Sequence, residues 1–202
     1  MSTETAEARP DGLSPSQTVG PFFHYGLTPG AAYGHVPVSV DGQVAAPGTP
    51  SEPIVLTGRV VDGAGDPVPD AMLEIWQADS DGRYAHPDDG RPRASNSFTG
   101  FGRSDTTAEG VYRFTTIKPG RVPGPGGREQ APHVLVAVFG RGMLKQLFTR
   151  IYFDDEASNA EDPILALVPA GRRPTLIARR DGDTFTLDIR LQGGDETVFF
   201  DV

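Results

Sequence analysis

Runs of alternating apolar and polar residues dominate the chain from residue 53 onward. They are rich in β-branched and aromatic residues and are bounded by Gly, Pro, Asn or Asp, a pattern typical of half-buried β-strands. A strong turn signal, Asp181-Gly182-Asp183, precedes the last run, and only 155–168 and 174–180 could be helical or 3₁₀. Strands are predicted over 54–62, 71–77, 111–117, 133–140, 147–153 and 184–191.

The first two runs flank the turn residues Asp62 to Gly65. Asp-Gly and Ala-Gly tolerate the positive φ of tight turns, so a β-hairpin is predicted between 54–62 and 71–77. Pro67 and Pro69 stand at the start of the second run. Proline cannot donate to a β-ladder, so these residues predict that the second strand lies at a sheet edge.

Strands at this density, without long helical periods, predict an all-β fold: an antiparallel β-sandwich with short helical turns. The predicted division is an extended N-terminal arm over 1–52 and a sandwich over 53–202. The arm contains Phe22, Phe23 and Tyr25. Because these aromatic side chains would gain nothing in solvent, we expect the arm to lie against a protein surface and assign it to partner contact.

Composition narrows the function classes. The chain has 202 residues with 25 Gly and 19 Pro, a turn-rich but aperiodic composition that fits one folded domain. A formal net charge of −9 disfavours nucleic acid or an anionic membrane as partner. Cysteine is absent, so there is no disulfide and no thiolate chemistry. The N-terminal residues contain no apolar segment typical of a secretion signal, and we expect a cytoplasmic protein.

Tyr84 is the first candidate for chemistry. It follows the second predicted strand in Gly82-Arg83-Tyr84, just past a turn. A phenolate oxygen there could bind a hard metal ion. The alternative interpretation is an aromatic ring that closes the edge of the sandwich core.

Two further segments accompany Tyr84: TVGPFF at 18–23 and IKPGRVPGPGGREQAPHVLVAVF at 117–139. Together with the predicted hairpin, they resemble the intradiol ring-cleavage dioxygenases. That resemblance implies a β-sandwich enzyme in which two tyrosines and two histidines hold a non-haem ferric ion. Such a ligand set suits a hard cation, because phenolate oxygen and imidazole nitrogen bind it better than sulfur does.

Only half of the ligand set is present here. The family's first tyrosine falls on Tyr84 and its second on Val122, while the two histidines of its H-x-H strand fall on His133 and Leu135. Neither Val nor Leu can coordinate a metal, so we expect no iron in this chain and no catalytic residue of its own. His133 is interpreted as a hydrogen-bonded core histidine. The other three histidines, His24, His35 and His86, have no partner at ligand spacing and are interpreted as surface or capping residues.

One branch of the family pairs an iron-bearing beta subunit with a homologous alpha subunit whose own site is vestigial. The segments 131–142, 149–165 and 188–202 resemble that alpha subunit, and the resemblance as a whole covers 13–202. It implies that iron(III) is bound by a partner beta subunit carrying the Tyr/Tyr/His/His site, with a small aromatic acid at the interface.

The resemblance also implies substrate-binding residues in this chain. Thr18, Gly20 and Pro21 belong to a turn expected to approach the partner's iron and substrate. Arg141 stands between two glycines and could reach a carboxylate, either the partner's or that of the aromatic acid. Tyr84 is expected to line the same interface. For Arg141 the alternative is an ordinary solvated arginine.

Two other functions stay open. A self-sufficient dioxygenase would need a third and a fourth metal ligand, and bound ferric iron in the chain expressed alone would reveal it. A non-enzymatic β-sandwich binding module would fit G-x-V-x-D-x-x-G-x-P-V at 58–68. Co-purification of a homologous, iron-bearing partner from the native host would argue against that module.

Overall fold

A computed structural model of the chain describes residues 18, 20, 26–29, 40–49, 51–93 and 97–201. Apart from a helical segment at residues 26–27, the helices in this part are short 3₁₀ helices, and no helix in the described ranges is long and apolar enough to cross a membrane. The 3₁₀ turns are η2 (Pro125–Gly127), η3 (Ala157–Glu161), η4 (Leu165–Leu167) and η5 (Arg173–Leu176). The strands are β1 (Pro53–Val61), β2 (Met72–Trp76), β3 (Phe101–Asp105), β4 (Val111–Ile117), β5 (Val122–Pro123), β6 (Glu129–Gln130), β7 (His133–Phe139), β8 (Leu147–Phe153), β9 (Ile177–Asp181), β10 (Thr184–Thr186) and β11 (Ile189–Arg190).

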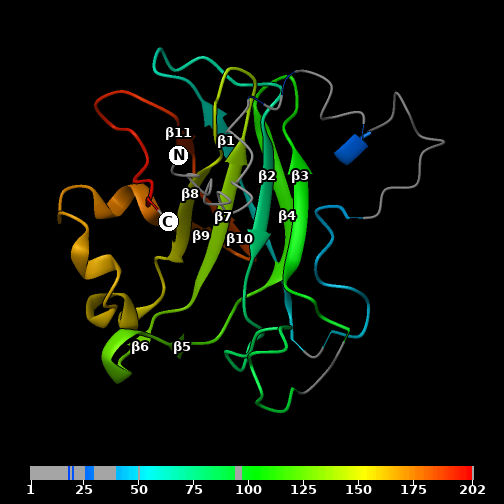
Figure 1. The fold of residues 1–202 in the computed structure, drawn as a ribbon, viewed down its shortest axis with the longest axis vertical. Coiled ribbons are helices and arrows are strands. Elements are labelled where there is room, and N and C mark those ends of the chain that lie inside the picture. Colours follow the sequence, from blue (N-terminus) through cyan, green and yellow to red (C-terminus); the bar gives the residue numbers. More distant parts are fainter. Residues whose placement is uncertain are drawn as a thin grey trace, which may run out of the picture.

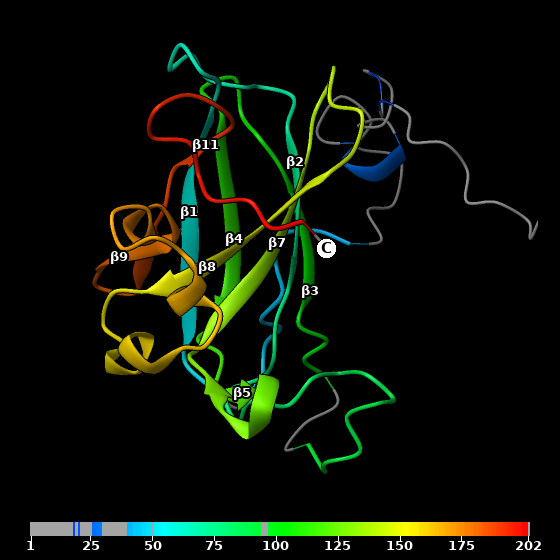
Figure 2. The same ribbon diagram turned by 60° about the vertical axis from the view of Figure 1, so that its left-hand side comes forward.

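The strands form two facing layers (Figures 1 and 2). Strands β4, β1, β10 and β9 make one layer, and β8, β7, β2 and β3 make the other. The parallel pair β8 and β9 joins the two layers at one side. The predicted all-β sandwich is confirmed, with the difference that the sheet is mixed, because β1 also pairs in parallel with β10 and β11.

Inward-facing residues of both layers make the main core. Alternate positions of each strand point inward, so β1 contributes Leu56 and Val60, while β7 contributes Val134, Val136 and Val138. All five are at most 1% exposed. A second, smaller core lies outside the β8 layer and contains Ala131, Tyr152, Leu165, Val168 and Leu176.

A segment before β1 closes the other side of the sandwich. Gly42 accepts a backbone hydrogen bond from Thr115 of β4, and Asp41 accepts one from Arg103 of β3. Val44 and Ala45 are each only 6% exposed. Residues 41–45 therefore belong structurally to the sandwich, although β1 begins at residue 53. Phe22, Phe23 and Tyr25 lie outside the described residues, and partner contact by the arm stays a prediction.

The predicted hairpin between the first two strands is wrong. The turn at 62–65 does form, and the amide of Val68 donates to the carbonyl of Val60 at 2.9 Å. The chain then crosses to the other layer, where β2 pairs with β3 and β7 and so is not an edge strand. Pro67 and Pro69 precede the first residue of β2, so they take no place in its ladder and do not restrict it to an edge.

One strand and two segments differ from what the sequence pattern predicts. Strand β3 was not predicted, because its sequence FGRSD is too polar and glycine-rich to show alternation. The run 184–191 is divided into β10 and β11, and the segment 174–180, predicted as helical or 3₁₀, begins as η5 and continues as β9.

Candidate functional site

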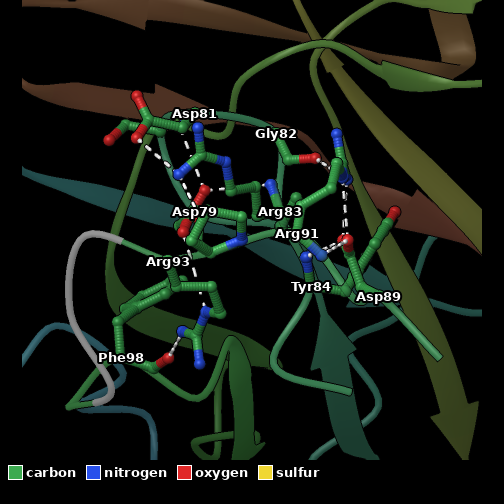
Figure 3. Close-up of polar contacts among 12 residues, drawn as sticks. Asp79, Asp81, Gly82, Arg83, Tyr84, Asp89, Arg91, Arg93 and Phe98 are labelled. Atoms are coloured by element: carbon green, nitrogen blue, oxygen red, sulfur yellow. Dashed lines mark hydrogen bonds and ion pairs between the residues drawn. The ribbon is translucent and has the colours of Figure 1, made fainter. Parts of the chain in front are cut away.

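A loop after β2 carries Tyr84 and is held by charged side chains. The Asp79 carboxylate accepts hydrogen bonds from the amides of Asp81 (3.0 Å) and Arg83 (2.9 Å). Arg91 donates through Nε and Nη2 to the two carboxylate oxygens of Asp89, each at 2.7 Å, and this pairing lowers the pKa of the Asp89 carboxyl well below its usual range. Figure 3 shows this cluster of aspartates and arginines around the turn.

Backbone geometry explains the glycine in Gly82-Arg83-Tyr84. Gly82 has φ +73°, and a Cβ at this position would lie 1.8 Å from the carbonyl oxygen of Arg121. The carbonyl of Gly82 accepts a hydrogen bond from Arg91 Nη2 at 2.7 Å, and the amide of Tyr84 donates to Asp89 at 2.8 Å. The tyrosine is thus fixed by the loop on both sides.

The Tyr84 ring stacks on Trp76, with centroids 5.9 Å apart and planes 15° apart. Trp76, Tyr84, His86, Arg91 and Pro123 line an open hollow of about 740 Å³. Burial raises the pKa of the Tyr84 hydroxyl above its usual value, although the nearby charge of Arg150 acts in the opposite direction. The phenol is therefore protonated at neutral pH.

His133 and Leu135 share the outer face of β7, as residues two apart on a strand must. His133 is 4% exposed, and its Nδ1 lies 2.8 Å from the carbonyl oxygen of Ala131. Burial, with the Arg150 charge adding to it, lowers the imidazole pKa to about 4. The interpretation of His133 as a hydrogen-bonded core histidine is confirmed.

The positions carried over from the family do not fit a ferric ion. Val122 is buried in the short β5, at 3% exposure, and Leu135 offers only an isobutyl group. A guanidinium, that of Arg150, lies directly across the β7–β8 ladder from Leu135. Within the described ranges there is no group of three or more His, Asp or Glu side chains able to hold a metal. His24 and His35 lie outside those ranges, and His86 is an exposed residue whose Nδ1 accepts from the Asp88 amide at 3.2 Å.

A second group of predicted residues meets at the opposite end of β7. The amide of Gly142 donates to Thr18 Oγ1 at 3.2 Å, so residue 18 reaches the turn that contains Arg141. Gly20 has φ +67° with open space around it, so the positive φ, and not a lack of space, explains a glycine at this position. Pro21 lies outside the described residues.

Arg141 has a carboxylate partner that the sequence did not indicate. Its Nε forms an ion pair with Asp70, the side chain of which is 20% exposed, while that of Arg141 is 57% exposed. The guanidinium is therefore paired with a carboxylate in the structure, while more than half of its side chain stays exposed.

The structure brings Thr18 and Arg141 together but not Tyr84. Strand β2 runs antiparallel to β7, with Met72 opposite Phe139 and Trp76 opposite Leu135. Asp70 and Arg141 therefore lie at one end of this pair, and Tyr84 follows its other end. Arg150 and Asp70 were missed because their importance comes from neighbours distant in sequence, and no local motif marks either of them.

A family model described as "Dioxygenase" matches residues 28–193. The chain is 49% identical to the protocatechuate 3,4-dioxygenase alpha chain of Burkholderia cepacia, over 94% of this chain and 97% of that one. It is 40% identical to the beta chain of the same enzyme and organism, over 72% of this chain and 67% of that one.

Among solved structures, the chain is similar to the dioxygenase domain of a dioxygenase carbohydrate-binding protein fusion from Streptomyces sp. SirexAA-E. The TM-score is 0.57 at 27% sequence identity, covering 89% of this chain and 98% of that one.

Proposed function

The chain belongs to the intradiol ring-cleavage dioxygenase family, and we propose that it is the alpha subunit of a protocatechuate 3,4-dioxygenase. The complete enzyme is an oxidoreductase that opens protocatechuate between its two hydroxyls and incorporates both atoms of O₂, giving 3-carboxy-cis,cis-muconate. The observation that carries the proposal is the near full-length match to an alpha chain, combined with Val122 and Leu135 at positions where the family has metal ligands.

In this proposal iron(III) belongs to a homologous beta subunit with the Tyr/Tyr/His/His site. When bound there, the iron supplies the chemistry that activates the catechol towards O₂. The match to a beta chain supports a common ancestry for two such subunits. The self-sufficient dioxygenase is not supported by the residues of this chain, since an aliphatic pair cannot replace two ligands.

This chain's own contribution is a wall of the partner's pocket. Thr18, Gly20, Pro21 and Arg141 are proposed to face the aromatic acid, with Tyr84 lining the interface at the far end of β2. The hydrogen bond between Thr18 and Gly142 supports a common surface for the first group. The ion pair with Asp70 would hold the Arg141 guanidinium in place for the substrate carboxylate. A cytoplasmic location stays a prediction.

Expression with and without the partner tests this function. The chain alone should be colourless, iron-free and inactive, and addition of the beta subunit should give protocatechuate-dependent O₂ uptake. Iron is measured by metal analysis and by the visible absorption of a phenolate-to-iron transition. Stoichiometric iron in the isolated chain, or full activity of the beta subunit without it, would overturn the proposal.

A further inference from the structure

One row of side chains crosses the outer face of the second layer. The ladders place Phe101 opposite Trp76, Trp76 opposite Leu135, and Leu135 opposite Arg150. Each of these four side chains is only partly buried. The row therefore ends in a guanidinium after three apolar side chains.

The neighbouring row leaves a hollow in this face. There Ala137 lies between Glu74 and Phe148. Its methyl group is small, and the Phe200 ring of the C-terminal segment lies beside Phe148, whose carbonyl accepts from the Phe200 amide at 2.8 Å. The result is a groove of about 620 Å³, a size that fits a small organic molecule.

Arg150 is the one cation in this groove without a carboxylate of its own, as far as the described residues extend. Its Nη1 donates to Gln130 Oε1 at 2.7 Å and lies 3.3 Å from the hydroxyl of Tyr152, and neither group is charged. Among the described side chains no carboxylate lies within 4.0 Å of the guanidinium, whereas the groove's two carboxylates, Glu74 and Asp201, are paired with other cations. A half-buried, unpaired charge costs free energy that an anionic ligand would recover.

The groove also suits a flat ring. Trp76, Phe101, Phe148 and Phe200 present aromatic surface around it, and the Arg150 Cζ lies 5.8 Å from the centre of the Phe200 ring. Aromatic rings pack favourably in offset or edge-to-face arrangements, and a guanidinium can bind a carboxylate through two parallel hydrogen bonds. Apolar walls with a single cation match a ligand that has one ring and one negative charge.

We propose that this groove is a binding site for a small aromatic carboxylate, with Arg150 pairing with the carboxylate and the aromatic side chains contacting the ring. The site goes beyond the function proposed above. The lining that forms it comes from described residues of this chain, it lies away from the turn with Arg141, and it requires no metal. Leu135, which stands at one ligand position of the family, lies opposite Arg150, so this part of the face carries a guanidinium and an aliphatic side chain and favours an anion over a metal.

Isothermal titration of the complex formed with the iron-bearing partner tests this site, with benzoate as probe at pH 7. Because the partner's catalytic pocket can also bind benzoate, the quantity of interest is the binding that depends on Arg150. Arg150→Gln should remove one benzoate per copy of this chain or weaken that binding at least about ten-fold. Arg179→Gln removes the same charge from an exposed position on β9 and should leave the titration unchanged.

Two additional measurements guard against a folding defect. Leu135→Glu places a carboxylate opposite Arg150 on the neighbouring strand. This carboxylate should compete with benzoate for the guanidinium, while Arg150 itself is kept. Benzamide has the same shape without the charge, and its binding should not differ between the wild type and Arg150→Gln. The proposal is overturned if Arg150→Gln binds benzoate like the wild type, or if Arg150-dependent binding is equally strong for benzamide.

Discussion

At the level of single residues, the two most informative charges are Arg141, which is exposed, and Arg150, which is half-buried. Arg141 lies in the turn after β7 and Arg150 in the middle of β8, and of these two only Arg141 has a carboxylate partner among the described residues. The missing partner at Arg150 makes its groove attractive for an anion.

Arg141 is the residue most directly tested by kinetics of the reconstituted enzyme. Arg141→Ala should lower kcat/KM for protocatechuate about ten- to a hundred-fold, because a charge-assisted hydrogen bond contributes roughly 1.5–3 kcal/mol. Assembly and iron content should stay unchanged, and Arg141→Lys should recover only part of the loss. A catechol without the carboxylate should show a much smaller loss if the contact is direct.

Asp70→Asn is the companion variant. It removes the charge that orients Arg141 and should reduce kcat/KM in the same direction but by less, since the guanidinium remains. Arg179→Ala serves as the control for an exposed arginine. Wild-type kinetics in Arg141→Ala would identify Arg141 as a solvated turn residue and end the proposal for it.

His133 links stability to pH. Its pKa is lowered to about 4 by burial, whereas an unfolded histidine has a pKa near 6.5. Between these two pH values the unfolded state therefore binds more protons than the folded state. The free energy by which the uncharged, buried imidazole favours the folded state is complete above about pH 6.5 and is lost as pH falls towards 4. His133→Gln should remove up to about 3 kcal/mol of this pH dependence, measured by urea unfolding of the full chain at pH 7, 5.5 and 4.5. Parallel pH profiles for the two proteins would contradict it.

At the level of elements, the loop after β2 depends on close contact with the segment before β5. The carbonyl of Asp79 accepts from the amide of Gly120 at 2.8 Å, and Gly82 touches the backbone of Arg121. This contact holds Tyr84 against Trp76. The loop is therefore rigid through its backbone as well as through its arginines.

Gly82→Ala tests this rigidity. The new methyl group would meet a backbone oxygen and the residue would keep a left-handed conformation, so unfolding free energy should fall by more than about 2 kcal/mol. The matched control is Gly171→Ala, because Gly171 has open space around it and no positive φ. Its effect should stay within about 1 kcal/mol. Equal stability of the two variants in thermal unfolding would show that the loop relaxes easily.

For the whole molecule, exposed apolar surface remains on the outer layer. The groove over β2, β7 and β8 is open, and Leu167 and Leu144 are 78% and 69% exposed. The C-terminal phenylalanines pack partly against this chain's own cores: Phe199 against the main one and Phe200 against the smaller one. The open groove and the exposed leucines therefore make the outer layer a surface through which the isolated chain is expected to self-associate.

We expect the isolated chain to self-associate at micromolar concentration and to return to a defined complex when the beta subunit is added. Permanent hetero-complex interfaces often exceed about 2,000 Å² and resemble a protein core. Sedimentation velocity of the chain with and without its partner measures this. Leu167→Gln should reduce the association, and a monodisperse wild-type monomer would contradict the expectation.

The sequence alone determined the all-β class, most of the longer strands and the aliphatic residues at two ligand positions of the family. Alternation and turn residues act over a few neighbours, so runs such as 111–117 and 147–153 became β4 and β8 with the same bounds. The side-chain chemistry at Val122 and Leu135 needs no coordinates to exclude a metal ligand.

Only the tertiary structure decided which strands pair and which charges meet. The turn residues at 62–65 are compatible both with a chain that returns beside β1 and with one that crosses to the other layer. The crossing is favoured because it buries the apolar faces of the two layers against each other. Arg141 with Asp70, and Arg150 opposite Leu135, are separated in sequence by 71 and 15 residues, respectively. Their meeting depends on the register of ladders that no local pattern encodes, because register is fixed by the packing of the whole sandwich.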